Sequence, residues 1–192
     1  MRHGETEWSR TGQHTGRTDL SLTAEGRAEV ESSKPLVRPT AERTAGADLY
    51  QPGGQGQGNR PRSFFPDRTG RLRRTIAEYD YGDFEGLTTT EIRSRVPDWD
   101  IWRDGCPNGE NTAAVGRRAD AFLDAVSGIR LCRSPQFHTV TCCEYWPARF
   151  LGLAGQDGRI FTLDTAAVSV LKVVRGSRVI GLWNATRGVF PG

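Results

Sequence analysis

The sequence predicts a single α/β domain over residues 1–192, because helical and strand-like patterns both occur along a chain long enough to bury one core. Apolar residues recur at helical spacing over 112–127. Runs rich in β-branched residues occupy 160–163, 168–174 and 179–183, and only four residues join the last two runs. These last two runs therefore predict a hairpin that completes a mixed sheet.

Two more helices are predicted from capping residues. Thr23 is placed to cap a helix over 24–31, with an acidic residue in its first turn. Thr89 or Thr90 is placed to cap a short helix that ends before Pro97. Both helices have the length of ordinary globular elements.

Composition limits the classes of partner. No run of 18 apolar residues is present, so we expect no membrane span and a cytoplasmic protein. The net charge of +3 is too mild to predict a nucleic-acid partner, and it suits a small anionic substrate equally well. The arginine-rich stretch 53–74 leaves a nucleic-acid binder as an alternative, which predicts strongly salt-dependent affinity. We favour a stretch without periodic structure.

Metal and redox chemistry are not indicated. The four cysteines have no C-x-x-C spacing and no neighbouring histidine set, so we expect reduced thiols and no metal site. They are Cys106, Cys132, Cys142 and Cys143. We expect no cofactor either, and the sequence leaves an oligomer possible.

The triplet Arg2-His3-Gly4 has residue types suited to phosphoryl transfer. A histidine can attack phosphorus through one ring nitrogen, while a guanidinium forks onto two phosphoryl oxygens. Glycine keeps the backbone slim where a phosphate must approach and allows turns that a side chain forbids. Such a triplet also occurs by chance, so its context decides the interpretation.

Three ordered blocks supply that context. The residues are Arg2 to Thr6, Trp8, Ser9, Thr15, Gly16, Asp19 and Leu22 to Gly26 in the first block, Glu78 to Thr88 in the second, and Pro107 to Asn111 in the third. Together they resemble the histidine phosphatase superfamily, in its phosphoglycerate mutase-like and acid phosphatase branch. The resemblance implies a three-layer α/β/α fold with a mostly parallel central sheet.

The chain departs from the family pattern in three places. Met1 stands directly before Arg2, so we expect the first central strand to be missing or reduced to a stub. We also expect the fold to be disturbed at about 32–74 and 128–147, where the family's second arginine and second histidine are not recognisable. Arg38 and His138 lie near those places in the wrong context.

Both disturbed segments look frame-shifted. When the codons of residues 138–147 are read beginning at each third base, they can encode a His-Gly-His segment followed by a leucine-rich helix. This is the motif that the family has at this point, with the original frame restored from Ala148. A similar slip between 30 and 74 explains the Gly/Gln/Arg tract.

The resemblance assigns roles to six residues. His3 is the nucleophile that forms a phosphohistidine, Arg2 holds the phosphoryl oxygens, and Glu78 protonates the leaving oxygen and then activates water. The matched positions Ser9, Thr15 and Gly16 are expected to contact phosphate or substrate. His14 matches no catalytic position, and we expect it to be a solvent-facing loop residue.

The predicted function is hydrolysis of a small phosphorylated metabolite by a phosphate monoesterase. Two alternatives stay open: an impaired or inactive family member that only binds anions, and a phosphoglycerate mutase-type phosphotransferase. A pocket that lacks one arginine and one histidine has lost preorganised donors, each typically worth about 10²–10³ in rate. Dependence of phosphate release on His3 distinguishes an enzyme from a binder.

Overall fold

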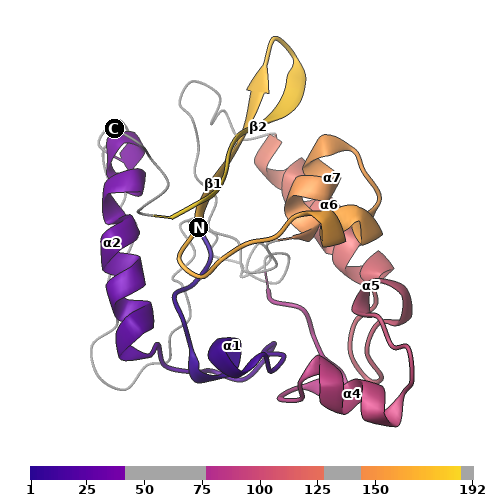
Figure 1. The fold of residues 1–192 in the computed structure, drawn as a ribbon. Helices are drawn as coiled ribbons and strands as arrows, with labels where there is room; N and C mark the ends of the chain where they lie inside the picture. The colour runs from indigo at the N-terminus through magenta and orange to yellow at the C-terminus, as the bar shows by residue number, and fades with distance from the viewer. Residues whose placement is uncertain (42–76, 128–143, 187–192) are drawn as a thin grey trace.

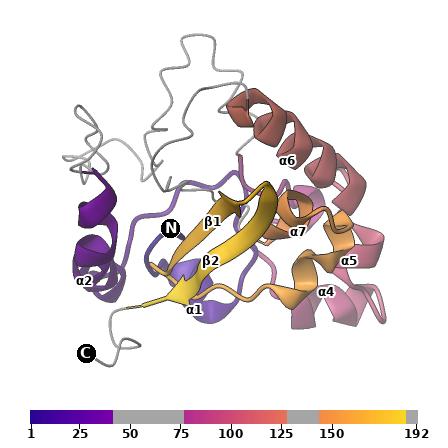
Figure 2. The same ribbon diagram turned by 90° about the horizontal axis from the view of Figure 1, so that it is seen from above.

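The computed structural model describes residues 1–41, 77–127 and 144–186. Its elements are α1 (Glu7–Thr11), α2 (Ala24–Ala41), η1 (Gly82–Phe84), α4 (Thr89–Arg95), α5 (Ile101–Asp104), α6 (Thr112–Ser127), α7 (Tyr145–Leu151), η2 (Gly155–Ile160), β1 (Val168–Val174) and β2 (Ser177–Ala185). In two perpendicular views the β1–β2 hairpin lies between α2 on one side and α5, α6 and α7 on the other (Figures 1 and 2). Helix α2 contacts β1 and helix α7 contacts β2. This layering confirms the predicted α/β class.

The described part of the chain contains one sheet, the antiparallel pair β1–β2. Its turn residues Arg175 and Gly176 have φ angles of 52° and 83°, the geometry that tight hairpins favour. The predicted hairpin is thereby confirmed. The parallel strands expected from the family resemblance do not occur among these residues.

The strand predicted at 160–163 is wrong. Residues 155–160 form η2, and the following segment bonds to side chains: Trp183 Nε1 donates to the Thr162 carbonyl at 2.9 Å, and Arg2 donates to the Leu163 carbonyl. Phe161 and Leu163 are nevertheless buried. Buried and exposed residues alternate over 160–163 as in a strand, but the ladder of backbone hydrogen bonds is absent from this described segment.

Helix α2 is ten residues longer than the helix predicted over 24–31. Gly26 N donates to Thr23 Oγ1 at 2.9 Å, which confirms the predicted cap. Ser33, only 1% exposed, donates its hydroxyl to the Ala166 carbonyl at 2.9 Å. This tertiary bond holds the helix past the point where the local sequence suggested its end.

A second group of helices encloses the larger core. Helix α6 has the predicted bounds, whereas α4 is capped by Thr88 rather than by Thr89 or Thr90. Thr88 and Glu91 form a reciprocal capping box, a spacing that the sequence already contains. The core residues are Tyr79, Phe84, Ile92, Trp99, Cys106, Val115, Ala119, Phe122, Tyr145 and Trp146.

Helix α7 begins inside a tract that we expected to be disturbed. Tyr145 and Trp146 are buried, and the Trp146 ring lies edge-on to Phe122 with centroids 4.4 Å apart. Pro147 is also fully buried. The disturbance predicted for 128–147 therefore does not extend to 145–147, while residues 42–76 and 128–143, with His138, lie outside the described residues.

The N-terminal segment runs between the two layers of helices (Figure 1). Arg2 N donates to the Ala167 carbonyl at 3.0 Å, and Ala166 N donates to the His3 carbonyl at 2.8 Å. These two backbone bonds attach the chain start to the segment before β1. The two bonds therefore fix the backbone on both sides of the His3 side chain.

Candidate active site

His3 has the tautomer that a nucleophile needs. Its Nδ1 lies 2.8 Å from the Gly4 carbonyl oxygen, which can only accept a hydrogen bond. The Nδ1 atom therefore carries the proton, and Nε2 keeps its lone pair. Burial lowers the His3 pKa, and the Arg2 charge lowers it further against the effects of the Gly4 bond and Glu29. The ring is thus held neutral near pH 7.

Close packing against α2 fixes the loop that carries His3. A Cβ atom on Gly4 would lie 2.2 Å from the Gly26 carbonyl oxygen, and one on Gly26 would lie 2.1 Å from the Glu5 carbonyl oxygen. Glu5 N also donates to Glu29 Oε2 at 2.9 Å. Glycine is required at position 4 because the backbone of α2 approaches there, and the predicted approach of a phosphate stays a prediction.

Arg2 connects the acidic and basic parts of the site. It donates from Nη1 to the Leu163 carbonyl. Its charge also acts on His3, Glu78 and Glu144, so the four side chains occupy one electrostatic neighbourhood. The Arg2 charge is therefore felt by both of the other residues predicted to be catalytic, His3 and Glu78.

Glu78 is a carboxyl group poised for proton transfer. Burial raises its pKa to about 7, against the lowering effects of the Tyr79 N–H bond and of the Arg2 and Arg118 charges, while Glu144 raises it. Tyr79 N donates to Glu78 Oε1 at 3.0 Å. The residue as a whole is half-buried, and the cause of the shift is desolvation of its carboxyl group. Such a pKa lets one group donate and accept a proton near neutrality.

Glu144 is a second buried carboxyl group that the sequence did not indicate. Burial raises its pKa, and the Arg2 charge opposes the shift. It lies in a tract where no family motif was recognised, so no local signal pointed to it. Its place beside Arg2 depends on how the chain packs in three dimensions.

The hydroxyl of Ser9 is engaged within α1. Thr6 N donates to Ser9 Oγ at 2.8 Å, and Ser9 N donates to Thr6 Oγ1 at 3.2 Å, which makes a reciprocal capping box. Ser9 Oγ donates in turn to the Thr6 carbonyl at 3.0 Å. The structure thus shows Ser9 shaping the loop after His3.

A glutamate occupies the turn that contains Gly16. Glu85 accepts hydrogen bonds from the backbone N–H groups of Gly16, Arg17 and Thr18 at 2.9–3.0 Å. The Gly16 N–H group is therefore already bonded to a carboxylate. Thr15 Oγ1 lies 3.5 Å from the Gln13 carbonyl, at the outer limit for a hydrogen bond, so this hydroxyl can turn toward a ligand.

His14 is not the solvent-facing residue that we predicted. Its ring stacks on Tyr81 with centroids 4.6 Å apart, and it meets Trp99 edge-on at 5.7 Å. Its Nε2 lies 3.3 Å from Thr89 Oγ1. Burial lowers the His14 pKa, partly offset by Glu85. Aromatic packing between distant segments decided this position, and the local sequence does not show it.

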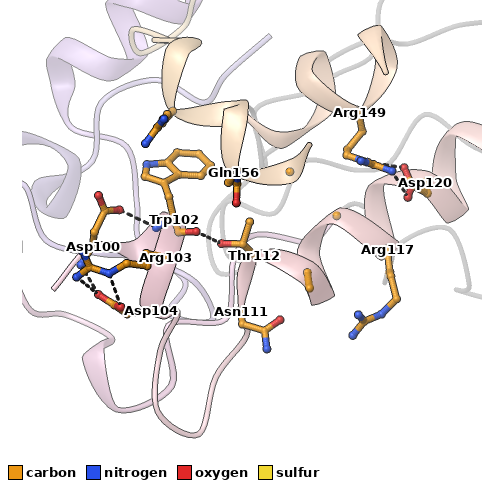
Figure 3. A pocket seen from close by; sticks show the side chains of 14 residues that line it. Asp100, Trp102, Arg103, Asp104, Asn111, Thr112, Arg117, Asp120, Arg149 and Gln156 are labelled. Atoms are coloured by element: carbon orange, nitrogen blue, oxygen red, sulfur yellow. Dashed lines mark hydrogen bonds and ion pairs between the residues drawn. The ribbon is translucent and has the colours of Figure 1, made fainter. Parts of the chain in front are cut away.

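An open groove of about 860 Å³ lies between α5, α6, α7 and η2 (Figure 3). The described residues that line it include none of the predicted site residues. Its charges are largely paired, as Arg103 with Asp104 and Arg149 with Asp120. This groove is therefore separate from the residues predicted to be catalytic.

The described residues contain no group of three or more His, Cys, Asp or Glu side chains that could hold a metal ion. Among the helices in this part of the chain, none is long and apolar enough to cross a membrane. Cys106 is a buried free thiol whose pKa burial raises to about 12, so it stays protonated. The other three cysteines, and the side chain of Arg38, lie outside the described part.

Comparison with known proteins decides the family. The model of the histidine phosphatase superfamily (branch 1) matches residues 1–41 and 69–186. The chain belongs to this superfamily. It is 31% identical to an acid phosphatase of Mycobacterium tuberculosis, with 97% of this chain and 91% of that protein aligned. It is 35% identical to the sedoheptulose 1,7-bisphosphatase of Saccharomyces cerevisiae over 67% of this chain and 55% of that protein.

Solved structures of this superfamily share the fold. A protein encoded by an open reading frame of M. tuberculosis aligns with a TM-score of 0.72 and 27% identity, covering 97% of this chain and 95% of that one. The α-ribazole phosphatase of Shigella flexneri aligns with a TM-score of 0.69 and 18% identity, covering 100% and 97%. These alignments confirm the phosphoglycerate mutase-like architecture predicted from the sequence.

Proposed function

We propose that this histidine phosphatase hydrolyses a small phosphate monoester through a phosphohistidine intermediate. The observation that carries the proposal is that the Arg2 charge acts both on a neutral, tautomer-fixed His3 and on Glu78, a carboxyl group whose pKa is about 7. The acid phosphatase that is 31% identical supports the same class of reaction. The proposal includes a single catalytic domain in a cytoplasmic protein.

In the first step, the lone pair of His3 Nε2 attacks phosphorus. The P–O bond to the alcohol breaks, and Glu78 in its protonated form gives its proton to the leaving oxygen. Arg2 holds two phosphoryl oxygens through its guanidinium fork and offsets the charge that develops on them. The products are a phosphohistidine, an ionised Glu78 and the free alcohol.

In the second step, water replaces the alcohol. The Glu78 carboxylate accepts a proton from the water as its oxygen attacks phosphorus, and the P–N bond to His3 breaks. Phosphate leaves, and both residues return to their starting states. The chain needs no metal ion or organic cofactor for these steps.

The remaining predicted residues act on the substrate side. Thr15 offers its hydroxyl to the bound ester, since its bond to the Gln13 carbonyl is long. Ser9 in α1 and Gly16 in the following turn shape the pocket through the Thr6 capping box and the Glu85 clamp. The substrate is a small phosphorylated metabolite held chiefly by its phosphate.

Trapping of the intermediate tests the proposal. We expect the wild-type protein to release phosphate from p-nitrophenyl phosphate and to carry acid-labile, base-stable labelled phosphate after rapid quenching with a labelled ester. His3→Ala should abolish both signals. Glu78→Gln should lower turnover of alkyl phosphates on the order of 10²-fold or more, whereas Glu144→Gln should have a smaller effect.

Two other results would redirect the assignment. Phosphate binding without turnover, measured by calorimetry on folded protein, indicates an anion-binding family member. Phosphate transfer to an added alcohol in preference to water indicates a phosphotransferase of the mutase type. Hydrolysis that persists unchanged in His3→Ala contradicts the proposed nucleophile.

A further inference from the structure

The stretch that carries Glu78 has no regular structure of its own. Residues 77–80 lie before η1 and are neither helical nor part of a strand. Their backbone groups therefore need partners from elsewhere. Whatever supplies these partners also determines where the Glu78 carboxyl group lies.

Arg118 supplies the first set of partners. It projects from α6 and donates from Nη1 to the Ala77 carbonyl at 2.8 Å and from Nη2 to the Glu78 carbonyl at 3.3 Å. Its Nε and Nη2 atoms also donate to the two carboxylate oxygens of Glu110 at 2.6 Å each. The planar fork of arginine makes such a bidentate arrangement possible, whereas an ammonium group cannot reproduce it.

Glu110 supplies the second set. Its Oε2 atom accepts from Asp80 N at 3.1 Å, and its own N–H donates to the Asp80 carbonyl at 2.8 Å. The Tyr79 hydroxyl donates to the Glu110 carbonyl at 2.8 Å. Together, Arg118 and Glu110 bond to every residue from 77 to 80.

The Arg118–Glu110 ion pair is largely shielded from solvent. The side chains of Arg118 and Glu110 are only 20% and 19% exposed, so water screens them weakly. The charged groups that act on Glu78 are Arg2, Arg118 and Glu144. Arg118 therefore touches the backbone of Glu78 and also contributes to the field at its carboxyl group.

We propose that Arg118 is a positioning residue for general acid catalysis, which holds residues 77–80 so that the Glu78 carboxyl group reaches the leaving oxygen of the substrate. This inference rests on the proposed function, because it assumes that Glu78 is the proton donor. Glu110 orients the guanidinium and completes the clamp. Arg118 itself does not contact the reacting atoms.

A second arginine–carboxylate pair that involves α6 provides a matched control. Arg149 on α7 makes a bidentate pair with Asp120 of α6, with both nitrogen–oxygen distances 2.8 Å, and donates to the Leu153 carbonyl at 2.9 Å. This pair also links an arginine fork to α6. Its hydrogen bonds in the described structure do not involve residues 77–80.

The experiment compares leaving groups. The ratio of kcat/KM for p-nitrophenyl phosphate to that for glycerol 2-phosphate is measured in the wild type, Arg118→Met, Arg118→Lys and Arg149→Met. A nitrophenolate leaves without much help, whereas an alkoxide needs the proton. We expect Arg118→Met and Arg118→Lys to raise this ratio by about 10- to 100-fold, and Arg149→Met to leave it unchanged.

The pH profile separates position from charge. Removing the Arg118 charge lets the Glu78 pKa rise, so the basic limb of kcat/KM should move to higher pH in Arg118→Met. Lysine keeps the charge and loses the fork, so the limb in Arg118→Lys should stay close to the wild-type position. Arg2 and Glu144 are unchanged in both variants.

Equal loss of both substrates in Arg118→Met and Arg149→Met, with an unchanged pH limb, would overturn the proposal in favour of a purely structural role. If Arg118→Met does not fold, the leaving-group ratio of Arg118→Lys decides alone, and an unchanged ratio overturns the proposal. Failure of the proposed function has a different signature. In that case, wild-type phosphate release does not depend on His3.

Discussion

The two halves of the active site are held in place in different ways. The histidine half, residues 1–34 and 160–186, contains a small buried cluster of Leu22, Val30 and Ala166 with Met1 packed against it. The carboxyl half, residues 77–127 and 144–159, contains the larger aromatic core. His3 is fixed by glycine contacts and backbone bonds, whereas Glu78 is fixed by a salt bridge over that core.

This difference predicts how substitutions in each half affect stability and activity. Stability should depend mainly on the carboxyl half, because burial of large apolar side chains is the main favourable term in folding. Activity should depend on small changes in the histidine half, since the loop of His3 has no free space beside α2. Four predictions test this contrast.

The largest expected effect is on stability in the carboxyl half. Phe122 is 1% exposed and packs on Trp146, so Phe122→Ala should lower the free energy of unfolding by about 3–5 kcal/mol. Val30→Ala, at a position 3% exposed in the histidine half, should cost about 2 kcal/mol. Urea unfolding of both variants measures the difference. Equal losses would remove the contrast between the two cores.

The second effect is the pH dependence of stability that Glu78 contributes. Its folded pKa of about 7 lies above the ordinary 4.5, so folding favours the protonated form and stability falls as pH rises through this window. The loss is complete above pH 7 and amounts to roughly 3 kcal/mol. The free energy of unfolding of Glu78→Gln, relative to that of the wild type, should therefore rise by this amount between pH 5 and pH 8. A constant difference between the two proteins across this range would contradict the assigned pKa.

The third effect is on activity in the histidine half. A Cβ atom on Gly26 would lie 2.1 Å from the Glu5 carbonyl oxygen and 2.5 Å from Glu5 N, so the segment after His3 must move. Gly26→Ala should lower kcat/KM on the order of 10²-fold. Gly116→Ala in α6 is the control. Its Cβ atom would meet only Arg149 Cδ, at 4.0 Å. That variant should keep its activity and gain up to about 1 kcal/mol of stability.

The smallest effect is the pH dependence contributed by His14. Its folded pKa lies below the ordinary 6.5 because of burial, so the unfolded chain binds the proton first and stability falls as pH drops below about 6.5. His14→Phe keeps the stacking on Tyr81 and removes the titration. Its loss of unfolding free energy between pH 7 and pH 5 should be smaller than in the wild type. An identical loss would show that His14 titrates normally.

Much of the site could be predicted because its residues lie in short local motifs. Arg2 and His3 are adjacent in the chain, and Glu78 begins the second block, so the family motifs were enough to propose all three. The bounds of α6 followed from helical periodicity, and the β1–β2 hairpin from β-branched runs joined by a short turn. Each of these signals is contained in a short continuous segment of the sequence.

The rest could not be predicted because it depends on distant contacts. Helix α2 continues because Ser33 bonds to the Ala166 carbonyl, which is 133 residues away. His14 packs against Tyr81 and Trp99, and Glu144 at the start of α7 comes within reach of the Arg2 charge. No local pattern contains these pairings.

The sequence by itself determined the family, because its motifs are short segments of particular residue types at fixed spacings, and those motifs supplied the proposed nucleophile His3 and the proposed proton donor Glu78. Only the tertiary structure decided the protonation and position of these side chains. The neutral tautomer of His3, the raised pKa of Glu78 and the clamp from Arg118 and Glu110 all depend on burial and on neighbours distant in sequence. Desolvation and charge proximity act through space, and residue order along a chain does not specify them locally.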